Sequence, residues 1–473
     1  MALLRTAGIW TFSGALILGQ PCAPAQEPAS SHRVQRPPSA MAVTHRLPTI
    51  ETIPVDVASD GLFAGQTELE VNQLVDLIIA RNPSVEAMFH AWRAAAQRFP
   101  QAIALEDPMF MAMMAPASLH SQDVEAAYVL QGSQKFPWCG KRQARGRAAA
   151  AEARAMLGDA RNERLQVAQM ARTAFYDYFL VQRQLDLTQL NTRAIREFAD
   201  TARAKYENNQ VTEQDVLQAD IELADVERRQ IELERMRAVS VARINTLLLR
   251  IPNEALPPPP KKLELPSEVP PADMLRQLAV GQRPDLAAIT ARLRAEQAGV
   301  TLANKQYYPD ADIFGRYDSF WQPVETQSEL RGQVGVNMNV PIYHRKLAAG
   351  VSEAQFRVAQ RRAEYEQKVA DIQYEVEVAR AQVEESRRIV NLYAAKILPL
   401  AERNVSVARS NYDVGTTSFL GLSTALRQFI ELREKHQEAL ADLHRRSAEL
   451  ERVVGGPLPE MADFPREEMP PPR

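Results

Sequence analysis

The sequence predicts a mostly α-helical fold with a few membrane-spanning β-strands, built from two copies of one unit. Three observations predict it: motifs that recur in order, helical patterns of unusual length, and short segments of alternating polarity. The motif Asn82–Ser84 returns as Arg283–Asp285, and Tyr206–Asn209 returns as Tyr412–Gly415. The copies are about 200 residues apart, so the repeat is a whole folding unit rather than one turn of a solenoid.

Helical periodicity predicts the length of the elements in each half. The first half contains an uninterrupted helical pattern from Lys141 to Glu207, which would extend about 100 Å. A compact globular core cannot cover such a helix, so it must pack against other long helices. The remaining helices are predicted at 69–105, 212–249, 272–306, 346–413 and 418–454.

The helix predicted at 346–413 has an apolar seam with alternating spacings of three and four residues. This heptad register is typical of near-parallel helices that pack side by side. Because Pro399 interrupts the backbone hydrogen bonds of the helix, we expect a bend or a thickened waist there. The seam consists of Ile372, Val376, Ala379, Val383, Ser386, Val390, Tyr393, Ile397, Leu400 and Val407.

Extended patterns predict four strands per chain. In the last strand, Val334 and Val336 on one side alternate with Gln333 and Asn337 on the other. Such alternation suits the wall of a transmembrane barrel, although a half-buried soluble strand has the same pattern. Four strands cannot close a barrel, and open edges in lipid are costly, so several copies would have to share one barrel. The predicted strands are 108–117, 124–136, 312–321 and 331–342.

The ends of the chain and the region between the repeats have their own predictions. The first residues combine a charged start, an apolar run and a small-residue cleavage site, as in a secretory signal, with lipid modification of Cys22 as the alternative. In chain order, the predicted segments are a signal peptide (1–25), a proline-rich linker (26–65), the first repeat (66–250), a proline-rich linker (251–271), the second repeat (272–455) and a proline-rich tail (456–473).

The composition excludes several classes of function. A formal net charge of -3 provides no basic field for nucleic acid. The seven histidines show no metal-ligand or triad spacing, and no glycine-rich phosphate loop occurs. The sequence therefore predicts an exported protein that is not an enzyme and that needs no cofactor.

These motifs together resemble those of the outer-membrane efflux channel family, the TolC-like proteins, over residues 66–455. The resemblance rests on the duplicated helix–strand–strand–helix–helix order, on the openings at Pro83 and Pro284, and on the turn Tyr412–Thr416. The segment Lys135–Arg142 contains a Pro-x-x-Gly-Lys turn similar to that of members attached to heavy-metal exporters.

The resemblance implies a homotrimer in the bacterial outer membrane, with a shared twelve-stranded barrel in the lipid and an α-helical tunnel in the periplasm. It implies a passive export duct of a tripartite efflux system, docked to a periplasmic adaptor (membrane fusion) protein and an inner-membrane pump. The cargo would be metal cations or drugs, and the pump rather than this chain would select it. The alternative is a periplasmic helical-hairpin adaptor without a pore, which would normally have one hairpin rather than two.

The resemblance also implies a gate at the periplasmic tip. Asp215 matches an acid and Tyr412 a tyrosine of the family's latch, whereas Thr417 stands where the family has an arginine. Gly421 and Thr424 stand where some members narrow the pore with aspartates, which puts a cation-binding constriction in doubt. The alternative makes Asp215 a helix-start acid and Tyr412 a packing aromatic.

Asn209 and Gly415 are predicted to be equivalent turn residues between long helices. Both follow an apolar-periodic run, and both residue types tolerate positive φ at low cost. We therefore expect a left-handed backbone at both positions.

A methionine stripe occupies one face of the first predicted strand. Met109, Met111 and Met113 alternate along it, with Met114 beside them. We interpret the stripe as apolar wall facing lipid. The alternative is a copper-handling site, because thioether sulfur suits the soft Cu(I) ion.

Overall fold

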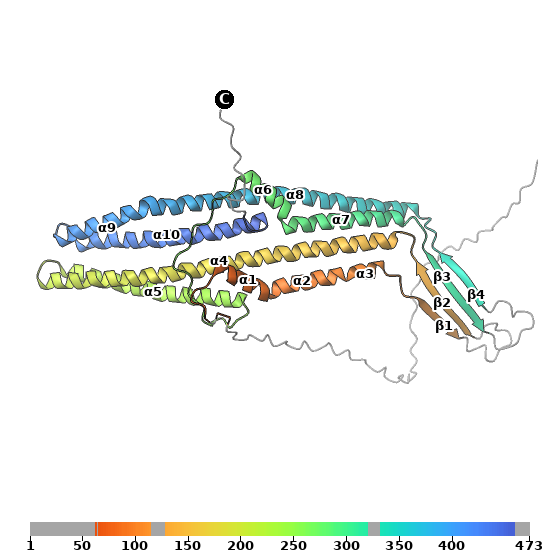
Figure 1. The fold of residues 1–473 in the computed structure, drawn as a ribbon, viewed down its shortest axis with the longest axis horizontal. Coiled ribbons are helices and arrows are strands. Elements are labelled where there is room, and N and C mark those ends of the chain that lie inside the picture. The colour runs from red at the N-terminus through yellow and green to blue at the C-terminus, as the bar shows by residue number, and fades with distance from the viewer. Residues whose placement is uncertain (1–61, 64, 115–127, 320–331, 459–473) are drawn as a thin grey trace, which may run out of the picture. The chain divides into compact units, whose positions relative to one another are not determined.

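The computed structural model describes residues 62–63, 65–114, 128–319 and 332–458. The predicted signal peptide, nearly all of the first linker, most of the tail and the segment between the first two predicted strands lie outside these residues. Within them, the two repeats have the same order of elements. In Figure 1, α1, α2 and α3 run along α4, and α7 runs along α8.

The elements follow the predicted order. The first repeat contains α1 (Val71–Arg81), α2 (Pro83–Ala96), α3 (Arg98–Ile103), β1 (Met109–Met114), β2 (Tyr128–Phe136), α4 (Lys141–Glu207) and α5 (Glu213–Leu247). The second contains α6 (Ala272–Gln282), α7 (Pro284–Lys305), β3 (Ala311–Ser319), β4 (Gly332–Met338), α8 (His344–Leu392), the π-helix η3 (Tyr393–Ile397), α9 (Leu398–Asp413) and α10 (Phe419–Val454). No helix in the described ranges has a stretch both long and apolar enough to cross a membrane.

The helices predicted as continuous at 69–105 and 272–306 are interrupted, so the prediction is wrong on this point. Asn82 and Arg283 have extended backbones, with ψ of 121° and 123°. Each precedes a proline, whose ring excludes the α conformation for the residue before it. In the first repeat α2 also ends at Ala96, because Pro100 lacks the N–H that would continue the hydrogen-bond ladder.

The two repeats bury equivalent residues in two separate cores. Leu74 of α1 and Leu275 of α6 are both fully buried, as are Val167 of α4 and Ile372 of α8. In each core a short helix, a long helix and the end of the last helix of the repeat supply the side chains. The duplication read from the sequence is therefore a duplication of packing.

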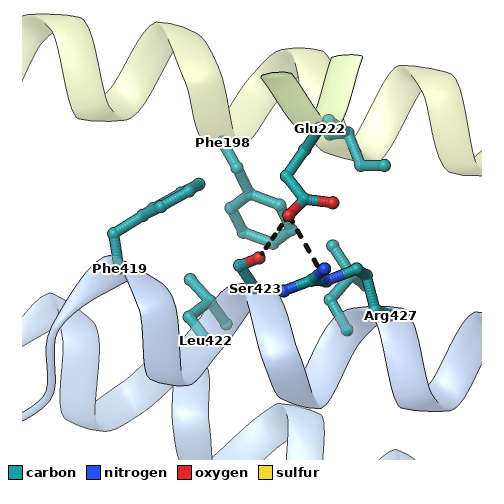
Figure 2. Close-up of a pocket in the computed structure, with 8 residues that line it drawn as sticks. Phe198, Glu222, Phe419, Leu422, Ser423 and Arg427 are labelled. Atoms are coloured by element: carbon teal, nitrogen blue, oxygen red, sulfur yellow. Dashed lines mark hydrogen bonds and ion pairs between the residues drawn. The ribbon is translucent and has the colours of Figure 1, made fainter. Parts of the chain in front are cut away.

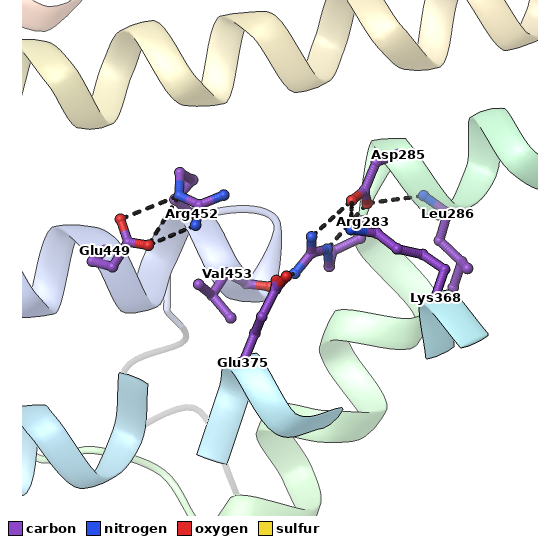
Figure 3. A network of polar contacts seen from close by, with 8 residues as sticks. All are labelled: Arg283, Asp285, Leu286, Lys368, Glu375, Glu449, Arg452 and Val453. Carbon is purple, nitrogen blue, oxygen red and sulfur yellow. Dashed lines mark hydrogen bonds and ion pairs between the residues drawn. The ribbon is translucent and has the colours of Figure 1, made fainter. Parts of the chain in front are cut away.

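The openings of α2 and α7 are fastened differently in the two repeats. In the first, Ser84 donates its hydroxyl hydrogen to Glu163 of α4 at 2.9 Å. In the second, Asp285 accepts two hydrogen bonds from Arg283 and lies 3.0 Å from Lys368 of α8 (Figure 3). The second repeat thus has a network of ion pairs where the first has a single hydrogen bond from a hydroxyl group to a carboxylate.

The four strands form one antiparallel sheet in the order β1-β2-β3-β4. Cross-strand partners point to the same face, so the register assigns each side chain to one of two faces. The apolar face includes Phe110, Ala112, Met114, Tyr128, Leu130, Phe136, Ile313, Tyr317, Val334, Val336 and Met338. The polar face includes Gln131, Ser133, Lys135, Asp312, Arg316, Asp318, Gln333 and Asn337. The separation is not complete, because Val129 and Phe314 lie on the polar face and Gln134 and Ser319 lie on the apolar face.

The methionine stripe does not belong to the apolar face, contrary to the interpretation of these residues as lipid-facing wall. Met111 is directly opposite Gln131, and Met109 and Met113 alternate with it on the polar face. Only Met114 lies on the apolar face. Sequence periodicity grouped the three methionines correctly, but it could not assign their face without the register of the neighbouring strands.

The predicted seam is correct as far as Val390 and then shifts by one residue. Its members from Ile372 to Val390 are buried, whereas Leu400 and Val407 are exposed. Beyond the shift, the inward positions are Ala401, Val405, Ala408 and Tyr412.

A π-helical turn at Tyr393–Ile397 accounts for the shift. Such a turn inserts one residue into the α-helical periodicity. It lies directly before Pro399, which lacks the N–H that a continuous α-helix would need there. The interruption expected at Pro399 therefore takes the form of a π-turn.

A buried lysine joins the two repeats beside the sheet. The side chain of Lys141 is 0% exposed, and its Nζ donates to the carbonyl of Tyr308 and to Asp310 Oδ1, both at 2.8 Å. Asp310 also accepts the backbone N–H of Trp138 at 2.8 Å, and the Trp138 ring stacks on Tyr308. This contact ties the start of α4 to the connection between α7 and β3.

Replacing Gly158 of α4 by alanine should destabilise the protein by about 1–3 kcal/mol, the usual effect of overpacking. A Cβ at Gly158 would lie 2.7 Å from the carbonyl oxygen of Pro284 and 3.0 Å from the backbone nitrogen of Ala288. These are backbone atoms at the start of α7, so they cannot rotate away. The midpoint of urea unfolding of the detergent-solubilised protein measures the effect.

Gly350→Ala in α8 is the matched control, because a Cβ there meets nothing within 4 Å. Alanine favours the helix over glycine by about 1 kcal/mol, so this variant should be slightly more stable than the wild type. Equal midpoints for the two variants would contradict the close contact between α4 and α7.

Candidate functional site

The two helical hairpins end in turns of the same geometry. Asn209 has φ 57° and Gly415 has φ 77°, the left-handed conformation predicted for both. The N–H of the residue after each turn residue bonds back five positions, from Gln210 to Lys205 at 2.8 Å and from Thr416 to Asn411 at 2.9 Å. This pattern ends a helix in a Schellman motif. Backbone hydrogen bonds therefore stabilise the turn at the tip of each hairpin.

Tyr412 is the centre of the packing at the tip. It is buried, and its ring meets the ring of Phe419 edge to face at 5.9 Å. Lys205 of α4 lies over the ring of Tyr412, with Nζ 4.2 Å from the ring centroid and 3.1 Å from the backbone oxygen of Tyr412. Tyr412 therefore links the first hairpin to the second, which agrees with the packing role considered for it.

The hydroxyl group of Tyr412 has no hydrogen-bond partner among the described residues. Burial first, and then the negative charges of Asp215 and Asp413, raises the pKa of Tyr412, so the group remains a donor. A buried polar group without a partner costs about 1–3 kcal/mol. The described part of one chain therefore leaves that donor unsatisfied.

Asp215 has a local role within the chain. Its carboxylate accepts the backbone N–H of Thr212 at 3.1 Å and the Thr212 hydroxyl at 3.0 Å. These contacts form a capping box that begins α5. The charge of Asp215 thus lies close enough to raise the pKa of Tyr412, but no hydrogen bond joins the two side chains within the described part of one protomer.

The other residues predicted for the gate add no charge to the tip. They are Thr417, Gly421 and Thr424. Thr417 lines an open cavity of about 590 Å³ together with Asp215 and Tyr412. A Cβ at Gly421 would lie 2.5 Å from the methyl group of Thr417. Thr424 is exposed and donates its hydroxyl hydrogen to the Leu420 carbonyl of its own helix at 2.7 Å.

A buried carboxylate on α5 holds α5 against α10, farther from the hairpin turns than Asp215 (Figure 2). Glu222 is 8% exposed, and its Oε1 accepts from Gln218 at 2.9 Å and from Ser423 at 3.0 Å. The Arg427 guanidinium lies 3.3 Å from the same oxygen. We call Gln218, Glu222, Ser423 and Arg427 the Glu222 clasp.

Sequence reasoning missed the Glu222 clasp, although one signal pointed to it. Glu222 follows Asp215 and Ala219 at spacings of seven and three residues, so it lies on the packed side of α5. A charged residue on a packed side needs a partner, which Ser423 and Arg427 provide. Farther along, Arg229 of α5 lies 3.2 Å from Glu434 of α10.

Comparison with known proteins identifies the family. The sequence model of the outer membrane efflux protein family matches residues 74–248 and 275–456. No individually curated protein sequence matches the chain. The chain is similar to the solved outer-membrane channel OprN, with 20% identity, a TM-score of 0.67, and coverage of 84% of this chain and 92% of that one.

Two further solved structures have the same fold. The outer membrane protein VceC from Vibrio cholerae has 17% identity and a TM-score of 0.68, covering 82% of this chain and 96% of that one. The open state of the MtrE outer membrane channel from Neisseria gonorrhoeae has 16% identity and a TM-score of 0.63, covering 82% and 89%. Because the family model matches most of both repeats, this chain belongs to the outer membrane efflux protein family.

Proposed function

We propose that the chain is the outer-membrane duct of a tripartite efflux system, and that three copies share one barrel. The observation that carries the proposal is the two-faced sheet. Its apolar face is exposed in the single chain, for example at Val334, Val336 and Phe110. A surface with apolar side chains on one face and polar side chains on the other matches a wall between lipid and water.

The edges of the sheet support a shared barrel. Within the described residues, β1 and β4 each pair on one side only. In lipid, unpaired backbone groups cost several kcal/mol each, so the sheet must close on further strands. Three copies of a four-stranded sheet supply twelve strands, enough to close a barrel around water.

The alternative of a periplasmic adaptor fits these observations less well. A soluble adaptor would not leave an apolar sheet face open to water. The family match covers both hairpins rather than the single hairpin expected of an adaptor. In the proposed assembly this chain performs no chemical step, and a periplasmic adaptor and an inner-membrane pump deliver the cargo, such as metal cations or drugs, to its tip.

The tip contacts support a gate in this duct. The Tyr412 hydroxyl, which has no partner among the described residues, would donate to Asp215 of a neighbouring copy, while the Glu222 clasp holds the two hairpins of one copy together. A phenol-to-carboxylate hydrogen bond contributes about 1.5–3 kcal/mol, which docking of an adaptor can overcome. Thr417, which cannot form an ion pair, would make this tip easier to open than one with arginine there.

Tyr412→Phe should raise single-channel conductance in planar bilayers, because it removes the proposed donor and keeps the ring that packs on Phe419. Tyr206→Phe is the matched control: Tyr206 is the equivalent residue of the first hairpin and is exposed. Asp215→Ala should raise conductance as well, and combining it with Tyr412→Phe should add little, since both remove one bond. Wild-type conductance in Tyr412→Phe, in Asp215→Ala and in the double variant would exclude the latch. A wild-type protein that forms no channel would exclude the duct.

A further inference from the structure

The wetted side of the sheet carries a row of three thioethers. Met109, Met111 and Met113 alternate along β1, and their side chains are 74%, 41% and 55% exposed. The register extends the row of Met111 through Gln131 and Arg316 to Gln333. The methionines thus face the same side as the charged and amide groups of the sheet.

Apolar packing explains only part of this placement: Val129, which is 5% exposed, lies directly opposite Met113, whereas Met109 and Met111 lie opposite Ser133 and Gln131. The apolar face has its own methionines, Met114 and Met338, among valine and aromatic side chains. Met109 and Met113 on the polar face are 74% and 55% exposed, and Met114 and Met338 on the apolar face are 62% and 55% exposed, so the two sets differ in their neighbours rather than in their exposure. Thioether sulfur differs from other apolar groups in one relevant respect, which is that it is a soft ligand for soft metal ions.

The spacing allows neighbouring sulfurs to act together. Residues two apart on a strand lie about 7 Å apart. Methionine has a flexible unbranched side chain, so sulfurs from adjacent rungs can converge on one ion between them. Met109 with Met111, and Met111 with Met113, therefore offer two overlapping pairs.

The charges around the row do not oppose a monovalent cation. Arg316 is paired with Asp318 at 2.8 Å, and Lys135 lies 3.3 Å from Glu106. Among the described residues, no group of three or more His, Cys, Asp or Glu side chains could hold a metal ion. Asp312 and Asp318 are carboxylates on this face but do not form such a group, so the three thioethers are the row of donors here that suits a soft ion.

We propose that Met109, Met111 and Met113 form a thioether ladder that binds soft monovalent cations, Cu(I) or Ag(I), reversibly. In the proposed duct, the polar face of the sheet lines the inside of the barrel. Three copies would therefore place three ladders around the path of the cargo. Ions would pass between overlapping sulfur pairs. The location on the inner wall rests on the proposed function, whereas the binding itself rests only on the row of sulfurs.

The test is titration of the detergent-solubilised full chain with Ag(I), which needs no reductant, followed by calorimetry in chloride-free buffer. All proteins carry Cys139→Ser, because the exposed Cys139 thiol would bind the same ion. The test variant replaces Met109, Met111 and Met113 by leucine, which conserves volume and removes sulfur. Met114→Leu on the opposite face of the same strand is the matched control.

We expect the triple variant to bind Ag(I) at least tenfold more weakly than the parent, and Met114→Leu to bind as the parent does. Equal binding by the triple variant and the parent, or no binding by the parent, would overturn the ladder. Potassium conductance is measured on the same proteins to test the duct separately. A parent that conducts potassium without binding Ag(I) refutes the ladder alone, and one that binds Ag(I) without conducting refutes the duct alone.

Discussion

Lys141→Met should destabilise the protein by about 3–5 kcal/mol, as expected when one partner of a buried ion pair is removed. Lys141 is fully enclosed, and its ammonium group satisfies Asp310 and the carbonyl of Tyr308. Methionine keeps most of the volume, so the loss reports the charge and its hydrogen bonds rather than a cavity. The midpoint of urea unfolding of the solubilised protein measures it.

Two further variants distinguish the effect of breaking the buried pair from the effect of losing any lysine. Lys135→Met removes a lysine whose side chain is 47% exposed and lies 3.3 Å from Glu106, and surface pairs contribute only about 0–1 kcal/mol. Adding Asp310→Asn to Lys141→Met should recover part of the stability, because the uncompensated charge is removed. A loss no larger than that of Lys135→Met would show that Lys141 does not join the repeats.

Much of the fold could be predicted because it depends on local periodicity. The long helix α4 has the bounds Lys141–Glu207 that were expected, since that segment contains no proline and only two glycines. The breaks before Pro83 and Pro284 were missed, although the restriction on a residue before proline is local as well. The register shift at Tyr393–Ile397 was not visible, because a π-turn has no pattern of its own and appears only in which side chains are buried.

The site could be predicted only where one residue decides the geometry. Asn209 and Gly415 have the expected positive φ, because few residues tolerate it. The face of the methionine row, in contrast, depends on pairing with β2. Two of the three partners of Glu222, Ser423 and Arg427, come from a helix about 200 residues later in the sequence. Such contacts follow from packing between repeats, which periodicity within one segment does not specify.

The charged network at the opening of α7 is another contact that only the structure shows (Figure 3). The side chain of Arg283 is 4% exposed; it binds Asp285 through two nitrogens, contacts Glu375 of α8 and donates to the carbonyl of Val453. Burial opposes ionisation of Asp285, but the hydrogen bonds and charges of Arg283 and Lys368 outweigh it and lower the pKa from 3.8 to about 2. One guanidinium therefore holds α7, α8 and the end of α10 together.

Arg283→Met should cost about 3 kcal/mol near neutral pH, because it leaves two carboxylates facing each other with only Lys368 to offset them. The difference from the wild type should depend on pH. The pKa of Asp285 is lower in the folded state than in the unfolded state, so its contribution is complete above about pH 4 and is lost as the pH falls toward 2. The variant lacks the guanidinium that lowers this pKa, so its stability should change less over that range and the two unfolding curves should converge in acid.

Arg276→Met in α6, at a pair with Asp273 that is largely exposed, should cost less than about 1 kcal/mol and show no such convergence. A gap between Arg283→Met and the wild type that stays constant from pH 7 to pH 2 would mean that the network contributes through packing alone.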